Sequence, residues 1–313
     1  LEGKYKDKGI NIEYTPVKYS SNNYDLRNGS KVFIKLSFDQ NGKVRGSIID
    51  VSREDYLKIL GLIFLGVVIL FGGLKGILSV SSLGVTGLVM IYIMIPLIVD
   101  GHNPIMVSII STIVIILISF VLISGFTRKS LVAILGTVGG TITAGILAKI
   151  FTDLCAITGF VGEEVNFLIT YMDIVIDYRG LYLSGVLIGA IGVVMDVSMS
   201  ITSVIFELKT QNPNMTFAGL VGSGLKVGRD IMATMVNTLI LAYVGGAMPI
   251  LLVFHFMKMP LGRLVSIEIL STEIIRSLCG SIGLILTIPL TSLIASMLVP
   301  SFRSMKRVYK HRS

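Results

Sequence analysis

One carboxylate, Asp196, lies near the middle of an apolar stretch, residues 181–206. Steps of three and four residues along one helix face meet only small or polar residues around it: Gly185, Gly189, Gly192, Ser200, Ser203 and Glu207. A carboxylate at bilayer depth costs roughly 2.5–3.5 kcal/mol on insertion scales and marks a functional site by default. We therefore take Asp196, with Ser200 and Ser203, as a candidate binding site for a cation or proton. The alternative is a face that only packs helices, with Asp196 hydrogen-bonded to a neighbour.

A second polar face lies in the next apolar stretch, residues 230–257, where Asp230, Thr234 and Asn237 share one side of a helix. If this helix runs antiparallel to the one before it, Asn237 reaches the level of Ser200, and both would line the same path. Asp230 belongs to the same candidate site. Near the inner surface, Arg229 is the expected partner of Glu207, although surface pairs of this kind contribute little to stability.

A third group, Glu273 and Arg276, stands at the start of the last apolar stretch with the i, i+3 spacing that allows an ion pair. It is a candidate outer gate, and the alternative is a neutralised pair at the membrane interface. No motif of a metalloprotease, serine hydrolase or dithiol enzyme is present, so no catalytic residue is assigned. Neither a metal nor a cofactor is expected. Cys155 and Cys279 are the two cysteines, and one disulfide between them is conceivable.

The composition indicates a membrane protein. Only 15% of the 313 residues are charged, 53% are hydrophobic, and 33 are glycine, whereas soluble domains average about 25% charged. Seven apolar stretches have about the length needed to cross hydrocarbon: residues 56–73, 83–99, 104–125, 130–149, 181–206, 230–257 and 277–299. We therefore predict an all-α polytopic membrane domain over residues 56–300, whose partner is the lipid bilayer.

Residues 1–55 differ from the rest and indicate a small β domain, incomplete at its N-terminus. Residues 32–38 and 43–51 resemble strands, and Asn41-Gly42 between them is a hairpin signal. With residues 1–55 left out and the C-terminal tail included, Lys and Arg residues outside the spans number eleven on one side and five on the other, which places the richer side in the cytoplasm. The β domain is then outside, and the basic tail, residues 301–313, is cytoplasmic. That tail indicates membrane anchoring, and no nucleic-acid partner is expected.

Three segments carry further expectations. Residues 150–180 form the largest outer loop, with one or two helices on the membrane surface. Residues 219–228 are rich in glycine but lack the spacing of lysine and hydroxyl residues that a phosphate loop requires. They therefore predict a flexible or broken helix before the sixth span. Small residues along residues 130–149, among them Gly136, Gly140 and Gly145, predict tight helix packing.

Several motifs resemble the YibE/F-like family of bacterial multi-pass membrane proteins. They are I-I-D-V-S-R-E-D-Y-L from position 48, F-G-G-L-K-G from 71, G-A-I-G-V-V-M-D-V-S-M-S-I from 189, G-R-D-I-M-A-T-M-V-N-T-L-I-L-A-Y from 228 and E-I-I-R-S-L-C-G-S-I-G from 273. The resemblance covers the chain from Ile48 onward. It implies an extracytoplasmic segment and a membrane core in a bacterial cytoplasmic membrane, with no assigned reaction or substrate.

Three functions are therefore considered. The first is a secondary transporter or permease, with Asp196 binding the cation or proton and Glu273 with Arg276 as the outer gate. The second is a non-transporting scaffold or partner subunit, whose outer domain binds another protein, in a homo- or hetero-oligomer. The third is an intramembrane enzyme. Transport predicts water around Asp196, and a scaffold predicts a dry, paired carboxylate.

Overall fold

A computed structural model describes residues 12, 14, 24, 26–38, 44–161, 163–172 and 176–299. The chain divides into two compact units, Leu1–Ile77 and Leu78–Ser313, and each is described by itself. The expected hairpin turn at residues 39–42 and the basic tail, residues 301–313, lie outside the described residues.

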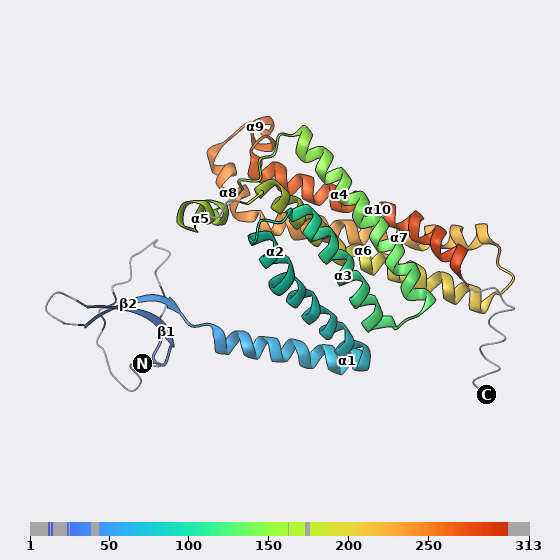
Figure 1. Cartoon of the computed structure of the whole chain (residues 1–313), viewed down its shortest axis with the longest axis horizontal. Coiled ribbons are helices and arrows are strands. Elements are labelled where there is room, and N and C mark those ends of the chain that lie inside the picture. Colours follow the sequence, from blue (N-terminus) through green and yellow to red (C-terminus); the bar gives the residue numbers. More distant parts are fainter. Residues whose placement is uncertain are drawn as a thin grey trace. The chain divides into compact units, whose positions relative to one another are not determined.

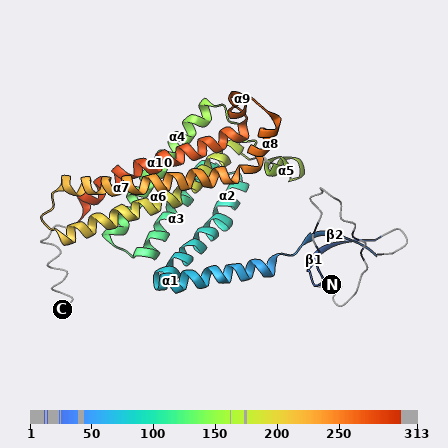
Figure 2. The same ribbon diagram turned by 180° about the vertical axis from the view of Figure 1, so that it is seen from behind.

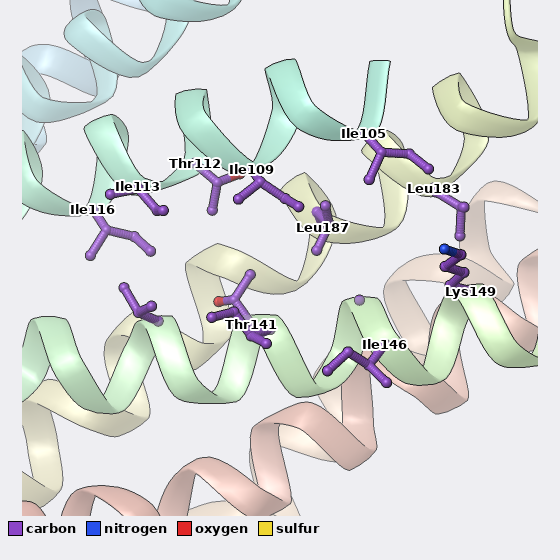
Figure 3. Close-up of a pocket in the computed structure, with 13 residues that line it drawn as sticks. Ile105, Ile109, Thr112, Ile113, Ile116, Thr141, Ile146, Lys149, Leu183 and Leu187 are labelled. Carbon is purple, nitrogen blue, oxygen red and sulfur yellow. The ribbon is translucent and has the colours of Figure 1, made fainter. Parts of the chain in front are cut away.

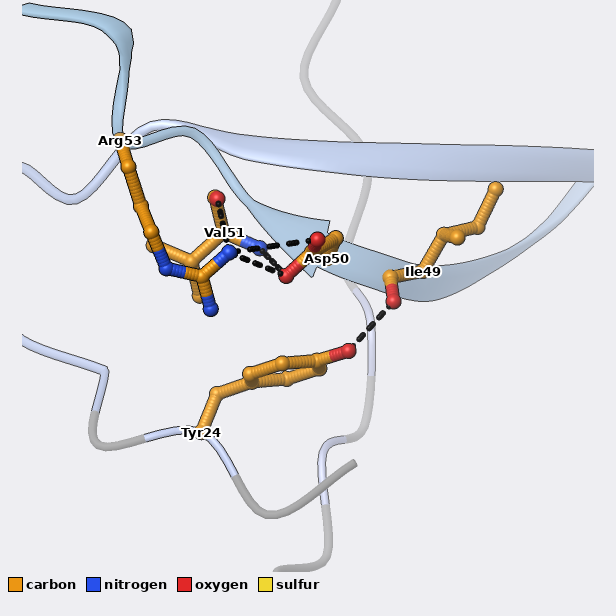
Figure 4. Close-up of polar contacts among 5 residues, drawn as sticks. All are labelled: Tyr24, Ile49, Asp50, Val51 and Arg53. Carbon is orange, nitrogen blue, oxygen red and sulfur yellow. Dashed lines mark hydrogen bonds and ion pairs between the residues drawn. The ribbon is translucent and has the colours of Figure 1, made fainter. Parts of the chain in front are cut away.

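The first unit contains a two-stranded antiparallel sheet, β1 (Val32–Phe38) and β2 (Val44–Val51), so the strands expected from the sequence are confirmed. Phe33 pairs with Asp50 and Ile34 with Ile48, which leaves Ile49 as a bulge. The Tyr24 hydroxyl donates to the carbonyl oxygen of Ile49 at 2.5 Å (Figure 4). Just beyond the strand, Arg53 Nη1 contacts both carboxylate oxygens of Asp50 at 3.1 and 3.3 Å.

Helix α1 (Glu54–Val89) begins shortly after β2 and is interrupted at Gly73, whose φ of 53° and ψ of −136° are not helical. Such a backbone conformation is accessible to glycine and strained for other residues. Beyond it, a Cβ on Gly76 would overlap the Val68 carbonyl oxygen. In a straight helix residues 68 and 76 would be about 12 Å apart. Their contact therefore shows a sharp bend, where the sequence predicted a loop over residues 74–82.

The second unit is a bundle of helices (Figures 1 and 2). After α1 come η2 (Met90–Met94), α2 (Ile95–Val99), α3 (Pro104–Ser124), α4 (Arg128–Leu154), α5 (Glu163–Met172), α6 (Tyr178–Gln211), α7 (Phe217–Gly246), α8 (Met248–Met257), α9 (Leu261–Val265) and α10 (Glu268–Leu298). The π-helical turn η2 precedes Pro96, which has no N–H for the regular helical hydrogen bond.

Four long helices start at side-chain caps. Asn103 Oδ1 accepts from the backbone N–H of Ile105 at 3.0 Å, and Thr127 Oγ1 accepts from the N–H of Ser130 at 3.2 Å. In the same way, Asp177 caps α6 and Thr216 caps α7. Each cap satisfies an N–H that the helix cannot bond internally, so these residues fix where α3, α4, α6 and α7 begin.

The centre of the bundle is built by α4, α6 and α10, which cross through small residues. A Cβ on Gly283 of α10 would lie 2.6 Å from the Ala144 Cβ and 2.9 Å from the Gly140 carbonyl oxygen of α4. Gly136 faces Thr291 in the same way. The small residues of the fourth predicted span therefore do what the sequence indicates: they let two helix backbones approach closely.

Several expected boundaries are wrong. The sixth span was expected to start near residue 230, but α7 is helical from Phe217, and residues 219–228 form no break. Gly224 lies against Ser292 and Gly228 against Ile288 of α10, so these glycines serve packing. Between α4 and α6, where the sequence predicts one or two surface helices, one helix, α5, is described. Cys155 is exposed, Cys279 is buried, and both are free thiols, so the conceivable disulfide is not formed.

In the described part of the chain, six helical stretches are long and apolar enough to cross a membrane. One of them is the 46-residue stretch Glu54–Val99 that contains the Gly73 interruption. The fold is therefore that of a helical, membrane-embedded protein with a small two-stranded sheet near its N-terminus.

Candidate functional site

The small and polar face of α6 lies at the surface of the bundle. Asp196, Ser200 and Glu207 are exposed and Ser203 is half-buried, whereas Val194 and Ile201 on the opposite side of the helix are fully buried. Asp196 stands midway along α6, and within the part of the chain that the structure describes its carboxylate has no hydrogen-bond or ion-pair partner. The sequence correctly grouped these residues on one face, and the structure leaves that face uncovered by the bundle.

Helix α7 packs antiparallel beside α6, and two contacts fix their relative level (Figure 2). A Cβ on Gly224 would lie 2.8 Å from Ile205 Cδ1, and a Cβ on Gly189 would overlap the Tyr243 hydroxyl. Between these contacts, Asp196 is level with residues 233–236, about one turn from Asn237. The sequence placed Asn237 level with Ser200. The difference arises because α7 starts about 13 residues earlier than expected and α6 ends about 5 residues later.

The exposed side of α7 is unusually polar for a membrane helix. Asp230, Thr234, Asn237 and Thr238 lie on it at the surface of the bundle. The two threonine hydroxyls donate to backbone carbonyls of their own helix. Asp230 and Asn237 have no side-chain partner among the described residues. A carboxylate and an amide therefore stand open on α7, as the Asp196 carboxylate does on α6. The exposed polar residues of these two helices are together called the α6–α7 face below.

The expected ion pair between Glu207 and Arg229 is not formed among the described residues. Glu207 Oε1 instead accepts from Gln211 Nε2, one turn along the same helix, at 3.0 Å. Glu207 and Arg229 are both exposed at the surface of the bundle. Glu207 bonds to Gln211 because a partner on the same helix requires less ordering of long side chains than a partner on another helix.

Toward the other end of α6, the glycine face is covered. Arg276 Nη1 of α10 donates to Glu273 Oε1 at 2.9 Å, and the two side chains are 26% and 28% exposed. The Arg276 guanidinium also lies 5.5 Å from the ring centre of Tyr182 and 5.9 Å from that of Tyr243, within cation–π range. The i, i+3 spacing predicted the pair of Glu273 with Arg276, but it carried no sign of the two tyrosines, which come from α6 and α7.

Two glycines of α6 lie against this cluster, and one of them, Gly189, leaves no room for a Cβ. A Cβ on Gly185 would be 3.8 Å from Arg276 Nη2, and Gly189 lies against the Tyr243 hydroxyl. A Cβ on Gly192, one turn further toward Asp196, would have no atom within 4 Å. The α6 face is thus covered by Arg276 and Tyr243 at one end and open from Gly192 to Glu207.

A further carboxylate, Glu268, holds the segment after α4 onto the start of α10. Its Oε1 accepts from the Thr158 N–H at 2.7 Å, the Thr158 hydroxyl at 2.8 Å and the Gly159 N–H at 2.9 Å. This contact was not predictable from the sequence, because Glu268 is about 110 residues from Thr158 and Gly159 and no local pattern links them. Since the chain itself supplies three donors to one carboxylate oxygen, Glu268 has a structural role.

The chemistry available at the α6–α7 face is the binding of a proton or a cation. Carboxylate, amide and hydroxyl oxygens are the ligands that hard cations prefer. No group of three His, Cys, Asp or Glu residues within the described ranges is placed to hold a metal ion. The fold and this face together define a polytopic membrane protein with an open polar stripe on its apolar helices.

The family model for YibE/F-like proteins matches residues 60–301. The match covers most of the chain and includes every residue of the α6–α7 face and of the Arg276 cluster. This protein belongs to the YibE/F-like family. No curated protein and no solved structure matches it significantly.

Proposed function

We propose that this protein is a secondary transporter or permease whose path runs along the open α6 face, with Asp196 binding a proton or a cation. The observation that carries the proposal is the carboxylate itself, which is midway along a membrane helix, open and without a partner among the described residues. Ser200 and Asn237 lie about one turn from its level and supply further oxygen ligands, Asp230 is about level with Ser200, and Ser203 lies two turns along α6.

Contact between this face and lipid would be unfavourable, because a carboxylate at the bilayer centre costs roughly 2.5–3.5 kcal/mol and open amide and hydroxyl groups add to that. The face therefore needs water or another polypeptide in front of it. We infer that a second copy of the chain or a partner subunit completes the path, so that the protein works as an oligomer.

The Arg276 cluster supports a gate at one end of the path. Arg276 and Tyr243 cover Gly185 and Gly189, while the face beyond Gly192 is open. Arg276 Nε is buried without a hydrogen-bond partner. A buried donor without a partner is destabilising by about 1–3 kcal/mol, so the covering position of Arg276 is not fully stabilised. Movement of Arg276 away from Tyr243 would uncover the glycines.

The proposed topology has seven crossings in a bacterial cytoplasmic membrane. The stretch Glu54–Val99 would be about 69 Å long if straight, more than twice the hydrocarbon thickness of about 30 Å. The bend at Gly73 divides it into two lengths that each suit one crossing. The distribution of Lys and Arg then places the two-stranded sheet outside and the C-terminus in the cytoplasm.

The second candidate is a non-transporting subunit, in which a partner helix packs on the α6–α7 face and the outer domain binds another protein. The observation in its favour is the small-residue character of the face, with Gly192 open to a helix backbone. In that case Asp196 would be dry and paired across the interface.

Water access to position 196 separates the two candidates. Asp196→Cys is placed in a Cys155→Ser, Cys279→Ala background and labelled with a membrane-impermeant thiol reagent from each side. Transport predicts labelling from at least one side. Ile282→Cys is the matched control, because Ile282 is exposed on the side of α10 that faces lipid. This thiol is expected to stay unlabelled. Protection at position 196 from both sides, in a folded variant, would overturn the transport proposal in favour of the subunit.

Lys75→Cys tests the seven crossings separately. Lys75 follows the Gly73 interruption, so the thiol is expected to react from the cytoplasmic side alone. Reaction from the side of the two-stranded sheet, or no reaction in a folded protein, would contradict two crossings within Glu54–Val99.

A further inference from the structure

A second feature of the bundle lies away from the α6–α7 face. Helices α3, α4 and α6 enclose a groove of about 240 Å³ that is partly open to the surroundings of the bundle (Figure 3). Its walls are mainly isoleucine and leucine, including Ile109, Ile113 and Leu187. Because α3, α4 and α6 are all long and apolar enough to cross the membrane, the groove opens toward lipid.

Two hydroxyls inside the groove lack partners. Thr112 on α3 and Thr141 on α4 are each 3% exposed, line the groove from opposite sides, and make no hydrogen bond through Oγ1 (Figure 3). Neighbouring threonines show the usual alternative: Thr137 and Thr143 donate to the carbonyl four residues earlier at 2.8 Å. Five other buried hydroxyls among the described residues also lack a partner and do not line the groove: Ser108, Thr152, Thr202, Ser281 and Ser292. The two threonines therefore add slight polarity to the lining and do not by themselves identify a ligand.

One end of the groove is positively charged. Lys149, near the end of α4, lines it and has no ion-pair partner in the described part of the chain. The nearby acid Asp153 is already paired with Arg179 at 2.5 Å. Ile105, in the first turn of α3, lines the same end, so the positive end of the α3 dipole lies there too.

We propose that this groove is a binding site for one anionic phospholipid. The phosphate contacts the Lys149 ammonium, and an acyl chain lies along the isoleucine-lined walls. Thr141 is eight residues, about 12 Å, from Lys149 along α4, with part of that distance spanned by the lysine side chain. Thr112 and Thr141 lie near the middle of α3 and α4, so they are level with the acyl chain and not with the ester groups.

The absence of tryptophan from the chain gives a clean fluorescence test. Ile142→Trp places an indole on the rim of the groove, and Ile282→Trp places one on the outer surface of α10. The two positions lie at the same depth, because Gly283 contacts Gly140 and Ala144. Each variant is reconstituted in phosphatidylcholine bilayers containing a minority of brominated phosphatidylglycerol or brominated phosphatidylcholine, which quench a nearby indole.

The indole at position 142 is expected to prefer brominated phosphatidylglycerol about fivefold, the effect of one lysine worth about 1 kcal/mol toward anionic lipid. Lys149→Gln should abolish that preference. At position 282 no preference is expected in any background.

Three results would overturn the proposal: equal quenching by the two lipids at position 142, a preference that survives Lys149→Gln, or the same preference at position 282. Since the measured quantity is a ratio between two lipids in one folded sample, a moderate loss of stability in a variant does not alter it. Native mass spectrometry of the unsubstituted protein gives a second measurement, which should show one retained phosphatidylglycerol per chain.

Discussion

The crossing of α4 and α10 allows a stability prediction to be worked from distances. A Cβ added at Gly283 would lie 2.6 Å from the Ala144 Cβ and 2.9 Å from the Gly140 carbonyl oxygen, whereas ordinary contacts are 3.4–4 Å. The second contact is with backbone, so no side-chain rotation relieves it. Gly283→Ala therefore requires the two helices to separate by roughly 1 Å.

Overpacking of this kind costs about 1–3 kcal/mol, and the higher helix propensity of alanine offsets up to about 1 kcal/mol. We expect Gly283→Ala to lower the free energy of unfolding by about 1–2 kcal/mol, measured by denaturation in detergent micelles. Gly87→Ala, where nothing lies within 4 Å of the added Cβ, is the control and should be neutral or slightly stabilising. Equal stability of the two variants would refute the close crossing.

Two more predictions follow from the polar contacts. Arg276→Gln leaves the half-buried Glu273 carboxylate without its partner. This single variant should therefore be less stable than the double variant that carries both Arg276→Gln and Glu273→Gln. A double-mutant cycle with no coupling energy would show that the ion pair contributes nothing to stability. Glu268→Gln weakens the bonds to the Thr158 amide by about 1–2 kcal/mol, which should raise hydrogen exchange at that amide roughly tenfold, while unchanged exchange would mean that other contacts hold the segment.

Local chemistry predicted most of the elements. The alternating strands at residues 32–38 and 44–51 and the long apolar stretches were recognisable because each pattern is repeated within one element. The start of α7 was misplaced because Lys226, Arg229 and Asp230 interrupt the apolar pattern, although Thr216 caps the helix before them. The end of the first span at residue 73 was recognisable from the glycine pair Gly72-Gly73, and the structure is non-helical at Gly73. The sequence did not show that the chain becomes helical again directly after it.

The site was predictable in composition and not in its surroundings. Helical spacing put Asp196, Ser200 and Ser203 on one face, but whether another helix covers that face depends on tertiary packing. The tyrosines around Arg276 and the partners of Glu268 come from distant parts of the chain. The unpartnered state of the threonines in the α3–α4–α6 groove was equally hidden, because helical threonines ordinarily bond to their own backbone.

Exchange of a proton or cation at Asp196 within the membrane is tested most directly by labelling with a hydrophobic carbodiimide, which modifies protonated carboxyl groups. Mass spectrometry of reconstituted protein reads the modification at position 196 across a range of pH and of Na⁺ or K⁺ concentration, with Asp230→Asn as the control that keeps Asp196. If Asp196 is the exchanging group, its modification falls as pH rises or as a bound cation replaces the proton. A role for Asp196 in transport would be contradicted if the extent of its modification did not change with pH or with cation concentration. It would also be contradicted if its carboxyl group did not react in the folded protein under any of these conditions.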